Sequence, residues 1–381
     1  MEAPGEHSCH VYRQGSCVFD GRLEELEELP SWQLCHQFCQ VNSCEHWTYD
    51  HLKKLCGTYS SGARLCLASY SPSLESPGYC GEEVATTTTL SPSYPLTLVT
   101  GGQLPNSSYV RAVQVVGGSC EVPPLHTGRA GHFPVATPGG EVLTCGGTFV
   151  PSDYEDGRLC YYLDLGLGLW RIHSRMATWH QHPLVVPLAG ATVVLDPVYQ
   201  ACEVLPADLP VWTGGLATCP PRYTRGSVAV PTGEDTFLLV GGSESATLVE
   251  EYQYAPSFGF LHRRLADLPL PCDHCGAARL GNLVVIAGGI NPFNIDATQI
   301  LDLATETLRL GLPMVEARVG LAMAVRGGRL YALGGRDGEE SLDTIEEWDP
   351  LLATWQVTGD RLALATTGFA VTTVPSNSVC L

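Results

Sequence analysis

The segment RLYALGG, residues 329–335, is an apolar strand pattern that ends in two adjacent glycines. The same pattern recurs four more times, as LTLVTGG, EVLTCGG, TFLLVGG and LVVIAGG, which end at Gly102, Gly147, Gly242 and Gly289. A glycine pair after a buried strand lets the backbone turn sharply and approach its neighbours closely. Each copy is therefore interpreted as one strand of a repeated structural unit.

The spacing of the glycine pairs indicates how many units the chain holds. Consecutive pairs lie 45, 95, 47 and 46 residues apart. The longest gap is nearly twice the others, which predicts a further unit near residue 195. The segment AGATVVLDP, residues 189–197, lies there, with Leu195 and Asp196 interpreted as replacing the glycines. Six units of about 47 residues, each with several strands, are typical of a β-propeller.

Each unit contains further strands around the glycine-ended one. An apolar strand precedes it, as in GHFPVAT, an alternating strand follows it, as in DTIEEWDP, and an outer strand such as TWQVT comes last. The first unit begins directly at its second strand, whereas the C-terminus holds an unpaired first strand, TTGFAVTTV, residues 366–374. We predict that this strand completes the first blade and closes the ring, which removes exposed sheet edges.

The units resemble kelch repeats, whose signature is a double glycine, a strand containing Tyr or Asp, and then a Trp. The sixth unit carries the whole signature, with Gly334, Gly335, EEWDP and Trp355. The third unit lacks the glycines, and the first unit departs from the signature in its third strand. The resemblance covers residues 95–375 and implies a mainly β fold, a six-bladed propeller over residues 95–381.

Sixteen cysteines are divided evenly, eight in the first eighty residues and eight from Cys120 onward. Such density in the N-terminal part is typical of secreted domains built on disulfides. In the propeller, neighbouring strands or the ends of one outer segment suggest local pairs, and the two remaining cysteines would tie the closing strand to blade 1. The predicted pairs are Cys145–Cys160, Cys202–Cys219, Cys272–Cys275 and Cys120–Cys380. The alternative for the C-x-x-C segment is a redox or metal site with His274.

Residues 9–81 form a predicted small domain around CHQFCQVNSCEHWTYD, residues 35–50. Apolar spacing predicts a helix over 30–40, followed by a strand over 44–50 and another around Cys56. Zinc could use Cys35, Cys39, Cys44 and His46. That spacing matches no common zinc pattern, so disulfides are favoured.

This segment resembles a PAN/apple domain, which has a helix carrying C-x3-C, a C-x-x-[FW]-x-Y segment and a further strand cysteine. The resemblance implies a small α+β domain, with Cys35 paired to Cys56 and Cys39 to Cys44. It also implies binding of proteins or carbohydrates without catalysis. The outer four cysteines, which allow three pairings, are Cys9, Cys17, Cys66 and Cys80.

Residues 82–94 are rich in Thr, Ser and Pro and form a predicted extended linker, either O-glycosylated or a plain spacer. The net charge is −19 and lysine is absent after Lys54, so neither nucleic acid nor an anionic membrane surface is an expected partner. No run of eighteen apolar residues occurs, so membrane insertion is not expected. The first twenty residues lack a signal-peptide pattern. A secreted protein would therefore be a mature form or an incomplete gene reading.

Candidate binding residues lie in loops that a propeller brings to one face: the loops between strands two and three, and the connections between blades. They combine carboxylates, aromatic side chains and arginines, which suit ligand docking. The alternative is solvated loops whose arginines bond to blade carbonyls. The candidates are Asp153, Tyr154, Glu155, Asp156, Phe293, Asp296, Asp337, Glu339 and Glu340 from the loops, and Arg129, His180, His182, Arg222, Arg225 and Arg318 from the connections.

The function expected from these features is that of a secreted interaction protein with two recognition modules, acting on extracellular protein or glycan ligands. Asn106 is the only N-glycosylation sequon, and its glycan would cover part of the candidate face. A structural subunit that associates with copies of itself is an alternative. A copper-radical oxidase, known on some kelch propellers, would need more than His180 and His182. No catalytic, metal or cofactor motif is present, so none is predicted.

Overall fold

The computed structural model divides the chain into two compact units, residues 1–89 and 90–381, and each is described by itself. In the first unit the backbone is described only in six short strands. In the second, the described residues are 95–136, 141–149, 154–207, 211–214, 219–220, 223–256, 259–290, 293 and 295–380. Among these described residues, no helix has the length and apolar character needed to cross a membrane.

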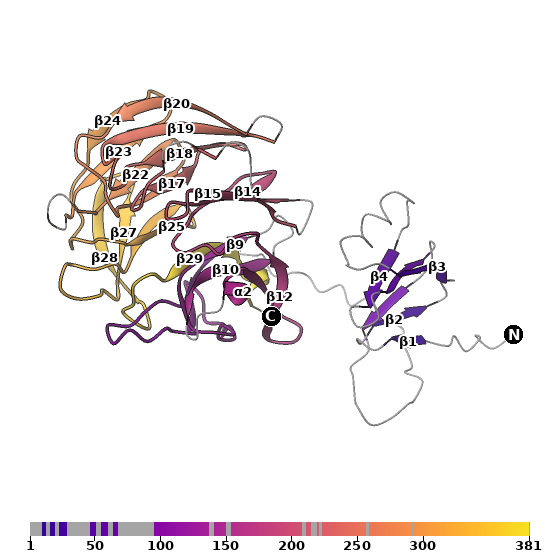
Figure 1. The fold of residues 1–381 in the computed structure, drawn as a ribbon. Coiled ribbons are helices and arrows are strands. Elements are labelled where there is room, and N and C mark those ends of the chain that lie inside the picture. Colours follow the sequence, from indigo (N-terminus) through magenta and orange to yellow (C-terminus); the bar gives the residue numbers. More distant parts are fainter. Residues whose placement is uncertain are drawn as a thin grey trace, which may run out of the picture. The chain divides into compact units, whose positions relative to one another are not determined.

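The first unit contains two three-stranded antiparallel sheets (Figure 1). One has the order β1-β2-β6, with β1 His10–Tyr12, β2 Ser16–Phe19 and β6 Arg64–Leu67. The other has the order β3-β5-β4, with β3 Leu23–Glu28, β5 Leu55–Tyr59 and β4 His46–Asp50. The strands expected at 44–50 and around Cys56 are therefore present as β4 and β5. The backbone register sets Cys17 opposite Cys66. The expected helix over 30–40 lies outside the described residues, as do Cys9, Cys35, Cys39, Cys44 and Cys80.

The second unit is a six-bladed β-propeller, and each blade is an antiparallel sheet (Figure 1). Blade 1 has three strands: β29 Ala370–Pro375, β7 Pro95–Thr100 and β8 Val113–Val116. Blade 2 consists of β9 Arg129–Ala136, β10 Val142–Phe149, β11 Leu159–Asp164 and β12 Leu169–Arg175, with the short helix α2 Tyr154–Gly157 before β11. Blade 3 consists of β13 Leu184–Pro187, β14 Ala191–Asp196, β15 Ala201–Pro206 and β16 Thr213–Gly214.

The remaining three blades each have four full strands. Blade 4 consists of β17 Val228–Pro231, β18 Thr236–Val240, β19 Leu248–Ala255 and β20 Gly259–Asp267. Blade 5 consists of β21 Gly276–Leu280, β22 Leu283–Ala287, β23 Thr298–Asp302 and β24 Thr307–Leu310. Blade 6 consists of β25 Ala322–Arg326, β26 Arg329–Leu333, β27 Thr344–Asp349 and β28 Thr354–Arg361. A short 3-10 turn, Ser376–Ser378, follows β29.

The ring closes as the sequence predicts. Strand β29, from the C-terminus, pairs antiparallel with β7, so that Val371 lies opposite Val99. The first strands of neighbouring blades also contact one another all the way round, from β9 through β13, β17, β21 and β25 to β29 and back to β9. The two ends of the propeller therefore share one blade, and its first strands surround a common axis.

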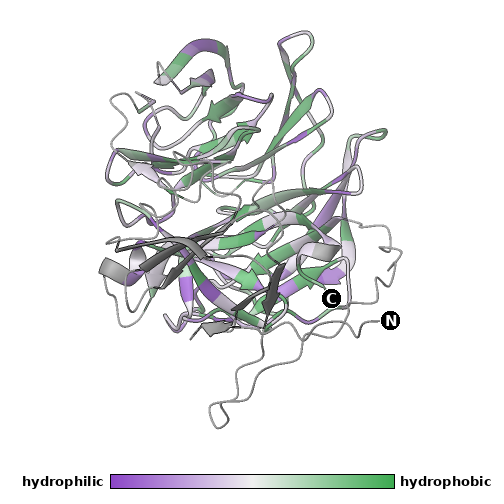
Figure 2. Ribbon diagram, turned by 90° about the vertical axis from the view of Figure 1, so that its right-hand side faces the viewer, coloured by the Kyte–Doolittle hydropathy of each residue, from purple (hydrophilic) through white to green (hydrophobic). Residues whose placement is uncertain are grey.

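Hydrophobic residues are concentrated along the strands (Figure 2). They form six buried clusters, and each cluster joins two adjacent blades. Between blades 5 and 6, for example, Val285 and Ile300 pack with Leu330 and Trp348. The cluster between blades 1 and 2 includes Val379, beyond the closing strand. Because the core is divided among the interfaces, each blade depends on its two neighbours.

The glycine pair of blade 3 is replaced one residue later than the sequence suggests. The residue before the first glycine lies opposite a first-strand residue, as Cys145 does with Phe133 and Leu333 with Ala322. In blade 3 the equivalent pair is Leu195 with Leu184. Asp196 and Pro197, rather than Leu195 and Asp196, therefore occupy the glycine positions. Without glycines, the strand end had no marker in the sequence.

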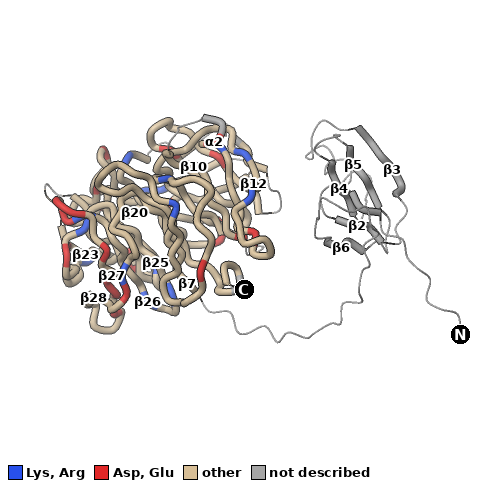
Figure 3. Tube along the Cα trace, turned by 90° about the horizontal axis from the view of Figure 1, so that it is seen from below, with Lys and Arg blue, Asp and Glu red and all other residues tan. Residues whose placement is uncertain are grey.

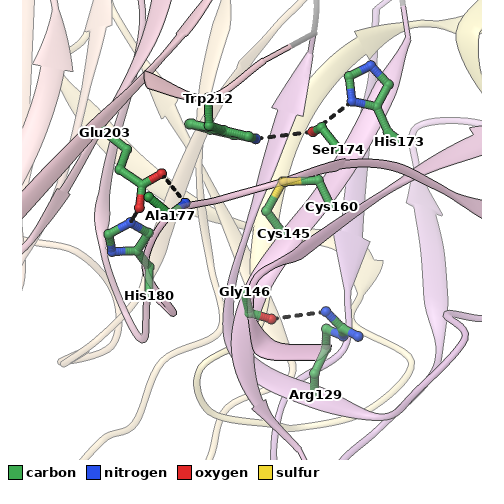
Figure 4. The surroundings of a disulfide bond; sticks show 10 residues. All are labelled: Arg129, Cys145, Gly146, Cys160, His173, Ser174, Ala177, His180, Glu203 and Trp212. Atoms are coloured by element: carbon green, nitrogen blue, oxygen red, sulfur yellow. Dashed lines mark hydrogen bonds and ion pairs between the residues drawn. A yellow bond between two sulfur atoms is a disulfide. The ribbon is translucent and has the colours of Figure 1, made fainter. Parts of the chain in front are cut away.

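The eight propeller cysteines form the four predicted disulfides. Cys145 and Cys160 face each other across β10 and β11, with 4.2 Å between their Cα atoms (Figure 4). Cys120 and Cys380 join residues 260 positions apart, with 5.6 Å between Cα atoms, and fasten the segment after β29 to blade 1.

The third strand of most blades carries a polar side chain that binds the connection entering that blade. In blade 1, Gln114 accepts from the Ala363 amide at 2.7 Å. In blade 3, Glu203 accepts from the amides of Ala177 and Thr178 at 2.8 and 2.6 Å. Gln299 and Glu346 do the same in blades 5 and 6, at the amides of Leu270, Val315 and Glu316. These contacts fix the connections at the blade surfaces.

Candidate ligand-binding face

Loops between strands two and three lie on the same face as the connections between blades. After four of the five glycine pairs, the next residue is hydrogen-bonded to the connection that precedes the first strand of the same blade. The backbone bonds are Gln103 N to Thr367 O (2.8 Å), Ser243 N to Arg225 O (2.8 Å), Ile290 N to Asp273 O (2.9 Å) and Arg336 N to Val319 O (3.0 Å). The loops are thus anchored at their bases, and one face of the propeller presents both sets of loops.

An open cleft of about 480 Å³ lies on this face where blades 6 and 1 meet. One wall comes from the blade 1 loop after Gly102, and the other from the blade 6 loop after Gly335, with the connection between these blades beneath. The lining residues are Gln103, Leu104, Pro105, Ser107, Arg336, Glu339, Glu340, Ser341, Ala365 and Thr367. The cleft therefore has an acidic wall, formed by Glu339 and Glu340 beside Arg336, that faces small, amide and apolar side chains.

The acidic wall is shaped by Asp337. Its Oδ1 accepts hydrogen bonds from the amides of Glu339 and Glu340, at 3.0 and 2.9 Å. These bonds hold the pKa of Asp337 below its ordinary value. The turn leaves both glutamate side chains exposed at the cleft. Of the loop carboxylates chosen from the sequence, Glu339 and Glu340 are the two that line this cleft.

Asn106 lies at the edge of the same cleft, between the lining residues Pro105 and Ser107. It is exposed, and its Oδ1 accepts a hydrogen bond from the Ser108 amide at 3.0 Å. The sequon therefore stands on a loop tip in open solvent. A glycan attached there would stand beside the cleft.

The other loop candidates are spread over blades 2 and 5. Asp156 is exposed within α2, and Asp296 is exposed on the blade 5 loop. Phe293, on the same loop, is 79% exposed. The side chains of Tyr154 and Glu155 lie outside the described residues, as do Asp153 and Arg222. The structure does not place these candidates in the cleft between blades 6 and 1.

Arg318 lies in the interior of blade 6 rather than on the rim. Its side chain is fully buried, and its Nε donates to Glu346 Oε1 at 3.0 Å. Its Nη1 donates to the carbonyls of Gly334 and Thr344 at 2.8 and 3.0 Å. The guanidinium turns inward because it satisfies both a buried carboxylate and the carbonyl of the first glycine. It is therefore not available to a ligand.

Arg129 occupies the same position in blade 2 and is also buried. Its Nη1 donates to the Gly146 carbonyl at 3.0 Å (Figure 4). Its guanidinium lies 5.3 and 5.2 Å from the ring centroids of Phe149 and Tyr161. Tyr161 stands where blade 6 has Glu346, so ring faces replace the carboxylate. Both arginines thus follow the alternative interpretation, in which they bond to blade carbonyls.

His180 replaces the arginine in blade 3. Both ring nitrogens are engaged, Nδ1 with Asp196 at 3.1 Å and Nε2 with Glu203 at 3.0 Å, and all three side chains are buried. Desolvation opposes the charged imidazolium, but the two carboxylates outweigh it and raise the pKa of His180. In turn, hydrogen bonds from His180 and backbone amides lower the pKa values of Asp196 and Glu203 despite desolvation. Asp196 occupies the first glycine position of blade 3. Its carboxylate therefore takes the place of the glycine carbonyl that accepts from the arginine in blades 2 and 6.

Residues 317–360 match the Kelch motif. This match covers blade 6, where the sequence carries the whole kelch signature. Kelch-like protein 26 from Mus musculus is 33% identical over 108 residues, which is 26% of this chain and 18% of that protein. Kelch-like protein 25 from Homo sapiens is 30% identical over 138 residues, 36% of this chain and 23% of that protein. The chain thus spans less than a quarter of the length of these relatives.

The solved structure of YjhT matches with a TM-score of 0.53 at 11% identity, covering 70% of this chain and 99% of that one. At this identity the likeness concerns the fold alone. The second unit is thus a six-bladed β-propeller that carries a Kelch motif in blade 6.

Sequence reasoning missed two exposed apolar residues on this face of the propeller. Val198 and Tyr199 lie on the tight turn between β14 and β15, where other blades have longer loops. The amides of both residues donate to Asp196 Oδ1, at 2.8 and 3.1 Å, which fixes the turn. The sequence signal was the turn segment DPVY itself, because an apolar pair in a tight turn has no core to enter.

In the described part of the chain, no three His, Cys, Asp or Glu side chains are grouped as metal ligands would be. His180 has both ring nitrogens hydrogen-bonded to carboxylates, so neither is free to coordinate a metal.

Proposed function

We propose that the protein is a secreted, non-enzymatic interaction protein whose kelch propeller binds protein or glycan ligands through the loop face. The observation that carries the proposal is the open cleft between blades 6 and 1, formed by anchored loops on that face. Kelch propellers typically bind proteins. The acidic wall of the cleft suits a ligand with basic side chains or with hydroxyl groups that donate to carboxylates.

The extracellular part of the proposal is supported by the cysteines. Four disulfides in a unit of this size are typical of oxidising compartments and rare in the reducing cytosol. The sequon at Asn106 and the cysteine-rich first unit, which resembles a PAN/apple domain, point the same way. In this proposal the first unit supplies a second binding module, and the tether raises avidity without new contacts.

The charge distribution is consistent with a selective binder of individual ligands. Arginines of the propeller are scattered among acidic residues (Figure 3). No basic stripe that would attract nucleic acid runs through the described residues.

The test is a binding screen of the intact, secreted protein against extracellular proteins and glycan arrays. A ligand of the cleft should lose at least tenfold in affinity when Glu339 and Glu340 are both changed to lysine. The matched control is Glu234→Lys, which reverses an exposed charge on the hairpin between β17 and β18. This hairpin lies at the end of blade 4 that is opposite to the loop face. Ligands that bind the double variant and the native chain equally would contradict the assignment to the cleft.

Two other functions are separated by simple measurements. A structural subunit would self-associate, and light scattering would show mass rising with concentration, whereas we expect a constant mass. An oxidase of the copper-radical type would purify with stoichiometric copper from copper-supplemented medium, whereas we expect none.

A further inference from the structure

The blade 1 wall of the cleft between blades 6 and 1 is a tight turn. In the segment LPNS, residues 104–107, the Ser107 amide donates to the Leu104 carbonyl at 2.9 Å. The Leu104 amide in turn donates to the Ser108 carbonyl at 2.9 Å. Pro105 stands at the second position of this turn, where its fixed φ is favourable. Asn106 therefore occupies the third position, at the tip of a hydrogen-bonded loop.

The side-chain nitrogen of Asn106 is available for modification. Its Oδ1 accepts from the Ser108 amide at 3.0 Å, whereas its Nδ2 has no hydrogen-bond partner among the described residues. Asn106 and Ser108 are both exposed. N-glycosylation joins a sugar to this nitrogen and needs the hydroxyl residue two positions later. The folded turn therefore leaves room for a glycan at its tip.

A sugar attached to Asn106 begins within the wall of the cleft itself. The residues on either side, Pro105 and Ser107, both line the cleft. Its volume of about 480 Å³ lies within the range of about 300–1,000 Å³ that is typical of small-ligand sites. Because the cleft is open to solvent, a group tethered at its rim can enter it.

The lining suits the first sugars of an N-glycan, which are N-acetylglucosamine. Their hydroxyl groups donate well to carboxylates, and Glu339 and Glu340 supply these on the blade 6 wall. Their N-acetyl N–H can donate to the side-chain oxygen of Gln103, whose nitrogen donates to the Ser107 carbonyl at 3.3 Å. The apolar part of the lining, which includes Leu104, would pack against the N-acetyl methyl group.

Both walls of the cleft are held in place by the backbone. Gln103 exchanges two backbone bonds with Thr367 of the connection beneath, at 2.8 and 3.0 Å. Arg336 exchanges two backbone bonds with Val319, at 2.9 and 3.0 Å, and its Nη2 donates to the Glu339 carbonyl at 3.2 Å. A cleft that is arranged in advance loses little conformational freedom when it is filled.

The covalent attachment makes weak contacts sufficient to fill the cleft. A group tethered close to a site has an effective concentration there of about 1 mM. A sugar whose dissociation constant is also about 1 mM would therefore occupy the cleft in roughly half of the molecules. A free ligand binds only the open molecules, so its apparent affinity falls in proportion to their fraction.

We propose that the N-glycan on Asn106 folds back into the cleft and closes it, so that chains without this glycan bind ligands there more tightly. This inference rests on the extracellular location in the proposed function, since N-glycans are typical of secreted proteins. It adds regulation to the same cleft. Occupancy of one sequon divides the protein into a closed and an open population.

The test is hydrogen exchange of the intact protein, secreted by cells that retain high-mannose glycans. The readout is the peptide covering residues 336–341, because it forms the opposite wall and carries no sugar. Its amides should exchange at least twofold faster in Ser108→Ala, as expected when the glycan fills half of the clefts. This variant removes the sequon but keeps Asn106 and the amide to which it is bonded. Removing the glycan enzymatically from the native protein should give the same acceleration, which needs no variant.

The matched control moves the glycan to another surface. Glu234→Asn, added to Ser108→Ala, creates a sequon with Thr236 on the exposed hairpin between β17 and β18. A glycan on this hairpin should leave residues 336–341 exchanging as fast as in Ser108→Ala alone.

A soluble probe tests the contacts without the tether. N,N′-diacetylchitobiose, which corresponds to the two innermost sugars, should slow exchange of residues 336–341 in Ser108→Ala when added at millimolar concentration. The same addition should change the native glycoprotein less, because its cleft is already partly filled. Equal slowing of both proteins would show that the attached glycan stays out of the cleft.

Three results would overturn the proposal: a secreted protein without a glycan on Asn106, equal exchange in the native and deglycosylated chains, or equal protection by the glycan at the control position. If one of these appeared while ligand capture still depended on Glu339 and Glu340, the binding function would stand and its regulation by the glycan would be wrong. Protection by the glycan in a protein that captures no ligand would reject the proposed function and retain the glycan contact.

Discussion

At the scale of single residues, one position before the first strand is filled differently in three blades. Blade 6 has Arg318 with a buried carboxylate, blade 2 has Arg129 between two rings, and blade 3 has His180 between two carboxylates. All three side chains reach the acceptor at the first glycine position. In each blade this side chain donates to the acceptor at the first glycine position. The neighbouring residue on the third strand determines whether an arginine or a histidine is suited to that role.

This difference predicts unequal costs for removing the two arginines. Arg318→Met leaves the buried Glu346 carboxylate without its cationic partner, so it should lower the free energy of unfolding by about 3–5 kcal/mol. Arg129→Met removes the donor to the Gly146 carbonyl and the contacts with two rings but leaves no buried charge behind, so it should cost about 1–2 kcal/mol. Urea unfolding of both variants measures the difference. Equal costs would contradict the roles given to Glu346 and Tyr161.

The His180 network predicts a pH dependence with two limits. The lowered pKa values of Asp196 and Glu203 mean that their stabilisation is present above their unfolded values and is lost as pH falls. The raised pKa of His180 means that its stabilisation is complete below its unfolded value and is lost as pH rises through the folded one. The network should therefore stabilise blade 3 most between about pH 4.5 and 6.5.

His180→Gln tests this dependence. The difference in unfolding free energy between native and variant protein should be largest, about 3–5 kcal/mol, near pH 6 and should shrink towards pH 9. Urea midpoints measured from pH 5 to 9 give this difference, with His262→Gln on the outer strand β20 as a control. A difference that does not change with pH would show that His180 is uncharged in the folded protein.

At the scale of elements, the sequence identified strands well where glycine marked their ends. The closing strand was found because one blade lacked a first strand and the C-terminus offered one. Blade 3 was misread by one residue because Asp196 and Pro197 carry no such marker. Arg129 and Arg318 were expected on the rim because sequence position does not tell whether a loop side chain turns inward.

The polar residue on the third strand was missed although the sequence carries its signal. Gln114, Glu203, Gln299 and Glu346 recur in the third strands of four blades, beside residues whose alternation predicts burial. One residue of positive φ lies at or just before the first strand of every blade, and this set was missed for a different reason. Only the closed propeller brings these residues from six blades to one axis. They are Gly368, Gly131, His182, Gly226, His274 and Gly320.

The two kinds of disulfide predict unequal costs of removal. In the chain-entropy model, a bridge across 17 residues such as Cys202–Cys219 stabilises by about 3 kcal/mol, and one across 260 residues such as Cys120–Cys380 by about 5 kcal/mol. Double alanine variants of each pair, compared by urea unfolding, should show this order. A smaller loss of unfolding free energy for the Cys120–Cys380 variant than for the Cys202–Cys219 variant would contradict this order. It would show that the closing segment does not depend on its disulfide.

At the scale of the whole molecule, closure by β29 predicts that the propeller depends on its last residues. Deleting 366–381 leaves β7 without its first-strand partner and removes Ala370, Val374 and Val379 from buried positions. The truncated protein should unfold or melt far below the parent, as measured by circular dichroism. Removing Leu381 alone is the control. A truncated chain that melts at the parent's temperature would show that the ring closes without this strand.

The central proposal is that an oxidised propeller, fastened by disulfides, works outside the reducing cytosol. Mass spectrometry of peptides from the unreduced, secreted protein tests it most directly. The account predicts at least six disulfides in the chain, including linked peptides for Cys120–Cys380, Cys145–Cys160, Cys202–Cys219 and Cys272–Cys275. Mostly free thiols, or zinc bound to the N-terminal cysteines, would contradict it.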